Sequence, residues 1–237
     1  MNFYRRSELD HAADARLRQY DTDVRAIVGP KFAWPVRMRD WELLRILDGL
    51  AKAPAGGRVL EVGSFNTYLA AYLASRGRDV IASDRLVARR RKSWLRRFGL
   101  AGAKPTEAPF GEWSSVLRRT GAHIRNLDAT HLPFPDGTFS VVIALSVLEH
   151  IPNVEQAIAE LYRVLAPGGK MLLTMDCAPT SKPYGKGVRY FTPSELETLF
   201  AKYPLTSEKA PPDFAQENWT YGGAQPVLPA FIEVTKA

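Results

Sequence analysis

The 237-residue sequence is poor in several features that would indicate a special class of protein. Cys177 is the single cysteine, which excludes an intrachain disulfide or a cysteine metal cluster and favours a reducing, cytoplasmic compartment. The longest apolar run, residues 141–148, contains Ser146 and is too short to span a bilayer. The first residues, with Arg5 and Glu8, lack the apolar stretch of a signal peptide. We therefore expect a globular, cytoplasmic protein.

The net charge of +7 comes from one segment of the chain. Residues 85–122 hold ten basic residues and two acidic ones, so the rest of the chain is slightly acidic. Such a segment can bind phosphates, a nucleotide-linked sugar, nucleic acid or an anionic membrane surface. Apolar residues such as Val87, Trp94 and Phe98 also recur in it at helical spacing. An amphipathic helix with a solvated arginine face therefore explains the segment equally without a ligand.

Strand-like and helix-like patterns alternate from residue 58 onward. Apolar segments predict strands at 58–63, 80–82, 123–127, 140–145, 170–175 and 227–234. Helices are expected at 68–76, from Asn153 with a capping box at Gln156 to Gly168–Gly169, and from Thr192. This alternation is typical of an open, mostly parallel α/β sheet. We expect one such domain at 58–237, with a basic insertion at 85–122, after a helical N-terminal extension at 1–57.

Polar residues follow three of the predicted strands, at the edge where α/β sheets bind their ligands. Residues 61–67 precede a helix, whose first backbone N–H groups can receive a polar ligand group. Asp84 ends the second strand, 21 residues after Gly63, and suits hydrogen bonding to a ribose diol. Asp128 ends the third strand and can accept a bond from an exocyclic amine such as that of adenine. Together these strand ends indicate a cofactor that contains adenosine.

Four further segments resemble the class I S-adenosylmethionine-dependent methyltransferases of the small-molecule type. They are LDATHLPFPDGTF at 127–139, LSVLEHI at 145–151, ELYRVLAPGG at 160–169 and FTPSEL at 191–196. The resemblance covers about residues 40–235. It implies a Rossmann-like, seven-stranded, mostly parallel sheet with flanking helices and an antiparallel last strand, and S-adenosylmethionine as the cofactor.

The resemblance also implies roles for individual residues. The first strand end would meet the methionine end of the cofactor, Asp84 the ribose, and residues 128–129 the adenine. The end of the fourth strand would line the cofactor and face the substrate. The implied cofactor-binding residues are Glu61, Gly63, Ser64, Phe65, Asp84, Arg85, Asp128, Ala129, Leu145 and Ser146.

The sequence departs from the glycine-rich cofactor loop of the family at two positions. Phe65 and Thr67 stand where the second and third glycines are expected, and a bulky ring there can block the pocket. The catechol O-methyltransferase-like subfamilies are similar in carrying an aromatic residue in this loop, and Phe65 and Tyr68 fit that variant. A non-enzymatic, methyltransferase-like binding or scaffold protein is therefore an alternative.

Methyl transfer to an acceptor of high pKa needs a base, and His150 is the predicted one because it follows the fourth strand. Glu149 beside it is a second candidate. No His or Asp cluster has metal-ligand spacing, so no metal is expected. The predicted activity is O- or N-methylation of a small-molecule or glycan acceptor, an anionic one if the arginines meet it. A nucleic-acid methyltransferase is a less favoured alternative.

Overall fold

The computed structural model describes residues 1–5, 8, 14–29, 37–65, 67–85, 110–185, 187–207, 210–215 and 226–237. Its helices are α1 (Ala15–Val28), α2 (Arg37–Ala51), α3 (Leu69–Ser75), α5 (Phe110–Thr120), α6 (Val154–Val164) and α7 (Pro193–Phe200), with a 3₁₀ turn η2 (Leu148–His150). Its strands are β1 (Asn2–Phe3), β2 (Arg58–Val62), β3 (Asp79–Asp84), β4 (His123–Asn126), β5 (Phe139–Leu145), β6 (Leu165–Cys177), β7 (Lys182–Gly185), β8 (Val188–Tyr190) and β9 (Leu228–Thr235).

Seven of these strands form one sheet in the order β1-β9-β6-β5-β2-β3-β4. The strands from β6 to β4 are parallel, and β9 is antiparallel to β6. This confirms the expected fold class. The edge strand β1, however, comes from a segment that was predicted to be helical. A strand of two residues is too short to show an alternating pattern, and only its pairing with Phe231 and Ala230 reveals it.

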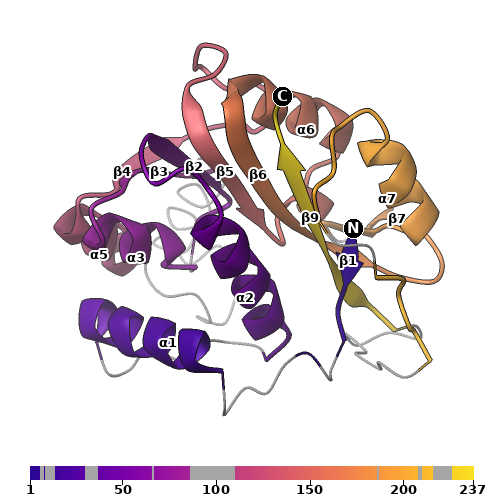
Figure 1. Cartoon of the computed structure of the whole chain (residues 1–237), viewed down its shortest axis with the longest axis horizontal. Coiled ribbons are helices and arrows are strands. Elements are labelled where there is room, and N and C mark those ends of the chain that lie inside the picture. Colours follow the sequence, from indigo (N-terminus) through magenta and orange to yellow (C-terminus); the bar gives the residue numbers. More distant parts are fainter. Residues whose placement is uncertain are drawn as a thin grey trace, which may run out of the picture.

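Helices cover both faces of the sheet, and Figure 1 shows α1, α2, α3 and α5 on one side with α6 and α7 on the other. Each face has its own apolar core. Strands β2, β5 and β6 contribute to both cores because successive side chains point to opposite faces. They are therefore buried on both sides, which is why apolar residues occupy consecutive positions along them.

The N-terminal helices belong to one of these layers. Helix α2 packs on β5, β6 and β9, and α1 packs on α3 and α5. The contact of α2 with β6 is close at Gly49, where a Cβ would lie 2.5 Å from Leu172 Cδ2. Residues before β2 therefore form part of the helical layer that covers one face of the sheet. Of the basic segment, residues 86–109 lie outside the described part of the chain.

The predicted start of α6 after Asn153 is confirmed, but the capping box and the predicted end are wrong. Asn153 precedes the helix but its side chain makes no capping bond. The helix ends at Val164 rather than at Gly168–Gly169, because Leu165 already pairs with Phe139 of β5 before a bulge in β6. The two glycines lie within the strand. The capping box predicted at Thr192 is present, with Pro193 in the first turn of α7.

Arg163 of α6 holds the segment 127–139 in place. Its guanidinium donates to the carbonyl oxygens of Leu132 and Phe134, at 2.9 and 2.8 Å, and to the carboxylates of Glu160 and Asp136, both at 2.7 Å. The planar fork of an arginine suits this set of partners. These bonds fix the loop that follows Asp128 against α6.

In the described residues, no helix has the length and apolar character needed to cross a membrane.

Candidate active site

The carboxylate of Glu61, at the end of β2, is fully buried and holds the loop that follows it. One oxygen accepts a hydrogen bond from the Thr67 hydroxyl at 2.6 Å, and the other accepts from the backbone N–H of Ala70 in α3 at 2.9 Å. Burial raises its pKa to about 7, against these hydrogen bonds, and the nearby charge of Asp84 contributes to the rise. Glu61 therefore acts on the loop and the helix start, rather than presenting its carboxylate to a ligand.

Backbone and hydroxyl bonds tie the same loop to β3. The amide and hydroxyl of Ser64 both donate to the Ser83 carbonyl, and the Ser83 hydroxyl donates to the Glu61 carbonyl. Gly63 has a φ of +71°, which favours glycine, and a Cβ there would lie 2.3 Å from Cγ2 of Val147. At Gly63 the loop thus packs closely against the segment that follows β5.

The two unusual loop residues, Phe65 and Thr67, have structural roles. The Phe65 ring is 9% exposed and packs against Trp113 of α5, with ring centroids 5.4 Å apart. Trp113 also donates from its indole nitrogen to the Ser64 carbonyl at 3.1 Å. The Thr67 hydroxyl is the donor to Glu61. Phe65 therefore belongs to the apolar core rather than obstructing the strand ends. Sequence reasoning missed Trp113 because it lies within the basic insertion.

Asp84 and Asp128 end the next two strands. Asp84 is half-buried, and its Oδ2 accepts a bond from the Phe65 amide at 3.1 Å. Oδ1 of Asp128 accepts from the Thr130 amide and hydroxyl, at 3.0 and 2.7 Å, and Oδ2 lies 3.5 Å from the exposed Arg85 guanidinium. These Thr130 bonds, more than Arg85, lower the pKa of Asp128. Two anionic carboxylates therefore lie on neighbouring strand ends, as the sequence predicts.

The end of β5 turns sharply at Ser146, which has a φ of +46° and is buried. Its amide donates to the Thr174 side chain at 2.9 Å, and its hydroxyl donates to Glu42 of α2. Leu145, the last residue of β5, is buried. Glu42 is fully buried and is paired with Arg39 at 2.8 Å. An N-terminal helix thus reaches the strand end that was predicted to face the substrate.

Three buried carboxylates, which we name the acid cluster, surround this turn: Glu42, Glu149 and Asp176. Burial raises the pKa of Glu149 well above its ordinary value, and Asp176 and Glu42 raise it further. Burial and the charge of Glu42 raise the pKa of Asp176 to about 7, while Arg39 opposes both shifts. Within the described residues, no group of three or more His, Cys, Asp or Glu could hold a metal ion. The sequence pointed to Glu149 but not to Glu42 or Asp176.

His150, the predicted base, is exposed on η2. Its Nδ1 lies 2.7 Å from the carbonyl oxygen of Gly187, in the turn between β7 and β8. Because a carbonyl only accepts, Nδ1 carries the hydrogen in this contact. The imidazole therefore supports the β7–β8 hairpin, and its catalytic role stays a prediction.

The sequence has relatives among known proteins. Residues 60–173 match the family model of the methyltransferase domain. A demethylmenaquinone methyltransferase of Thermus thermophilus is 34% identical over 97 residues, which cover 38% of this chain and 44% of the relative. A sterol 4-C-methyltransferase of Caenorhabditis elegans is 44% identical over 118 residues, covering 43% of this chain and 35% of the relative. The chain thus spans less than half the length of these curated relatives.

A solved structure has the same fold. The S-adenosylmethionine-dependent methyltransferase of Methanosarcina mazei superposes with a TM-score of 0.51 at 18% identity, over 79% of this chain and 96% of its own. Residues 60–173 thus match a methyltransferase domain, and the fold is that of an S-adenosylmethionine-dependent methyltransferase. The fold inferred from the sequence is confirmed, and the domain match supports the inferred family and cofactor.

The strand ends of this chain fit S-adenosylmethionine in the chemistry of their groups. Asp84 offers a carboxylate for ribose hydroxyls beside a loop that Gly63 lets turn back. Ala129 is buried next to Asp128, where its backbone can meet a base. The Phe65 ring beside these groups is packed on Trp113 in the apolar core.

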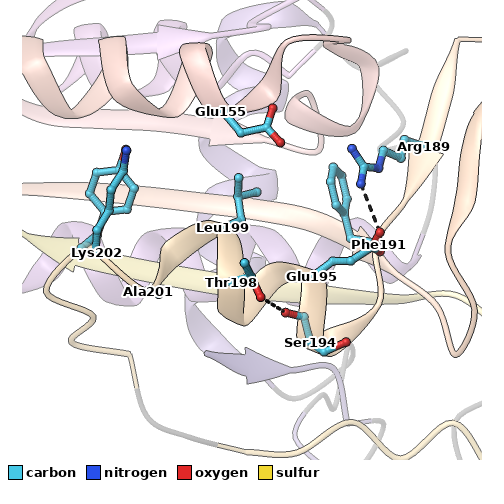
Figure 2. A pocket seen from close by; sticks show the side chains of 10 residues that line it. Glu155, Arg189, Phe191, Ser194, Glu195, Thr198, Leu199, Ala201 and Lys202 are labelled. Carbon is cyan, nitrogen blue, oxygen red and sulfur yellow. Dashed lines mark hydrogen bonds and ion pairs between the residues drawn. The ribbon is translucent and has the colours of Figure 1, made fainter.

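A separate pocket of about 500 Å³ lies on the other face of the sheet, between α6, α7 and β8 (Figure 1). Figure 2 shows Arg189 directed at Glu195, at 3.1 Å, with Glu155 and Lys202 at other parts of the rim. Arg189 and Phe191 line this pocket, whereas Tyr190 between them lies close to Asp176 and Glu149. Because successive side chains of β8 point to opposite sides, this strand separates the pocket from the acid cluster.

Gly63→Ala is expected to lower the free energy of unfolding by about 3 kcal/mol, from backbone strain and from overlap with Val147. Gly77→Ala is the matched control, because Gly77 has a φ of +80° but open space around its Cβ. It should cost only about 1 kcal/mol. Urea unfolding of both variants measures the difference. Equal losses, or no coupling of Gly63→Ala with Val147→Ala in a double-mutant cycle, would contradict the close contact.

Glu61→Gln tests the buried charge, since an amide can accept from Ala70 and donate to Thr67. A carboxyl whose pKa is raised in the folded state loses stability as pH rises from its unfolded pKa through its folded one. The wild-type protein should therefore lose about 2–3 kcal/mol more than the variant between about pH 5 and 8. Denaturant unfolding at several pH values measures this, with Asp79→Asn as the exposed control. Parallel profiles would show that Glu61 carries an ordinary pKa.

Proposed function

We propose that this protein transfers the methyl group of S-adenosylmethionine to a small-molecule acceptor. The observation that carries the proposal is the arrangement of Asp84 and the Gly63 loop on adjoining strand ends, with the acid cluster beside them at the ends of β5 and β6. When bound, S-adenosylmethionine supplies an electrophilic methyl group on a sulfonium. Alignment of the two reactants then provides much of the acceleration.

Each strand end has a distinct task in this scheme. Asp84 binds the ribose hydroxyls, and the backbone at Ala129 lies against the adenine. The loop at Gly63 and the backbone of Leu145 hold the methionine end. Glu61 keeps that loop in place through Thr67 and Ala70. Ser146, fixed by Thr174 and Glu42, forms the border with the acceptor.

The two curated relatives are named for acting on a quinone precursor and on a sterol, which supports a small organic acceptor over a glycan or a nucleic acid. The scaffold alternative depended on Phe65 and Thr67 in place of loop glycines, and the packing of Phe65 on Trp113 and the bond of Thr67 to Glu61 weigh against that reason. Against the nucleic-acid alternative, Arg119 of the basic segment donates to the Ile27 carbonyl at 3.0 Å, so this arginine makes a contact within the protein.

Calorimetric titration with S-adenosylmethionine and S-adenosylhomocysteine tests the proposal. We expect micromolar affinity for both ligands in the wild-type protein. Asp84→Ala should weaken it by about 10–100-fold, because it removes the charged acceptor to which the ribose hydroxyls donate. Asp79→Asn, at the opposite end of β3 and exposed, is the matched control and should bind like the wild type.

Two results would overturn the proposal. The first is the absence of binding of either ligand to the folded protein at two temperatures. The second is equal affinity in Asp84→Ala, which would place the cofactor away from β3.

A further inference from the structure

The acid cluster contains hydrogen-bonding capacity that the described residues do not use. Both carboxylate oxygens of Glu149 and Oδ1 of Asp176 are buried without a hydrogen-bond partner in the part of the chain that the structure describes. Their residues are 1% and 6% exposed. Glu42, by contrast, accepts from Arg39 and Ser146. The unused acceptors therefore belong to the two carboxylates at the ends of β5 and β6.

The charge of the cluster is also unbalanced. Among the described residues, Arg39 is the guanidinium that affects all three carboxylates, and it is bonded to Glu42. An unpaired carboxylate costs several kcal/mol when it is buried. Protonation of Glu149 or Asp176 reduces the repulsion between their charges. It still leaves buried acceptor oxygens, and it adds O–H donors that also need partners. A ligand that brings both positive charge and N–H donors satisfies the charge and the acceptors together.

We propose that Glu149 and Asp176 bind the protonated amino group of the methyl acceptor, so that the protein, on the methyl transfer proposed above, N-methylates a cationic small-molecule amine. An ammonium group offers two or three N–H donors to the three unused oxygens. Tyr190 of β8, whose pKa is raised by burial and by the charges of Asp176 and Glu149, borders the same site.

The sign of the charge decides between classes of acceptor. A phenol or an enol becomes an anion as it gives up its proton, and the carboxyl oxygens of the acid cluster oppose that anion. An ammonium instead becomes a neutral amine. The anionic acceptor suggested by the basic segment would meet the same repulsion at this end of the sheet.

The carboxylates also take part in the proton balance. An N–H proton of the ammonium passes to Glu149 or Asp176, which frees the lone pair on nitrogen. That lone pair forms the bond to the methyl carbon as the carbon–sulfur bond breaks, and sulfur keeps the electron pair as a neutral thioether. Carboxylates with a raised pKa accept such a proton better than surface carboxylates do.

The experiment uses S-adenosylmethionine labelled with ¹³C in its methyl group. The full-length protein is incubated with an equimolar mixture of phenethylamine, tyramine, putrescine, 2-phenylethanol, 4-ethylphenol and 1,4-butanediol, and in parallel with the small-molecule fraction of a cell extract. The ¹³C chemical shift of each product distinguishes a methyl group on nitrogen, oxygen or carbon. We expect label on nitrogen.

Glu149→Gln and Asp176→Asn keep the shape of the side chains and remove their charge. Each should slow N-methylation at least about tenfold while the affinity for S-adenosylmethionine changes less than about twofold. Glu233→Gln is the control: Glu233 is also a buried carboxylate, but it pairs with Lys170 in the opposite half of β6 and β9, and its variant should keep the wild-type rate. Thermal unfolding confirms that each variant folds; if Asp176→Asn does not, Glu149→Gln alone decides.

Label on oxygen or carbon, label on no amine although S-adenosylmethionine binds, or an unchanged rate in Glu149→Gln would each overturn the amine site and leave the proposed methyl transfer standing. Loss of S-adenosylmethionine binding by the wild-type protein would instead overturn the proposed function itself.

Discussion

The buried carboxylate of Glu61 is the constraint on which the cofactor edge of this protein depends. It accepts hydrogen bonds from the Thr67 hydroxyl and from the Ala70 amide in the first turn of α3. The strand, the loop and the helix are therefore held by one side chain. The same loop is bonded to β3 through Ser83 and is held from α1 by Tyr20, whose hydroxyl donates to the Thr67 carbonyl at 3.2 Å. Beyond Gly63 the loop needs no further glycines, because hydrogen bonds involving the side chains of Glu61, Thr67 and Tyr20 fix its conformation.

The strand ends divide into two chemically different halves. On β2, β3 and β4 the carboxylates of Asp84 and Asp128 are at least partly exposed and stay within reach of a polar cofactor. On β5 and β6 the carboxylates are buried, and α2 closes over them through Glu42 and Ser146. The N-terminal residues therefore contribute to both halves, Tyr20 to the loop and Glu42 to the acid cluster.

Local sequence signals were sufficient for much of the fold. Buried strands, the capping box at Thr192 and the order of the strand ends follow from short-range patterns, and so does Asp84. The missed features depend on distant contacts. β1 exists because Met1 and Phe3 pack with β9, and α6 ends early because Leu165 pairs with Phe139.

The same limit applies to the candidate site. Glu61 was assigned to the cofactor, but its partners Thr67 and Ala70 show that it holds the loop. Glu42 and Asp176 lie 134 residues apart in the chain and come together only through packing of α2 on the sheet. No motif spacing joins them, so the acid cluster was invisible until the fold was known.

The most direct test of the account is a crystal structure of the protein with S-adenosylhomocysteine bound. The account predicts ribose hydroxyls on the Asp84 carboxylate, adenine beside Ala129 and the sulfur directed toward the acid cluster. A ligand seated in the pocket between α6 and α7, or one whose sulfur points away from Glu149 and Asp176, would contradict it.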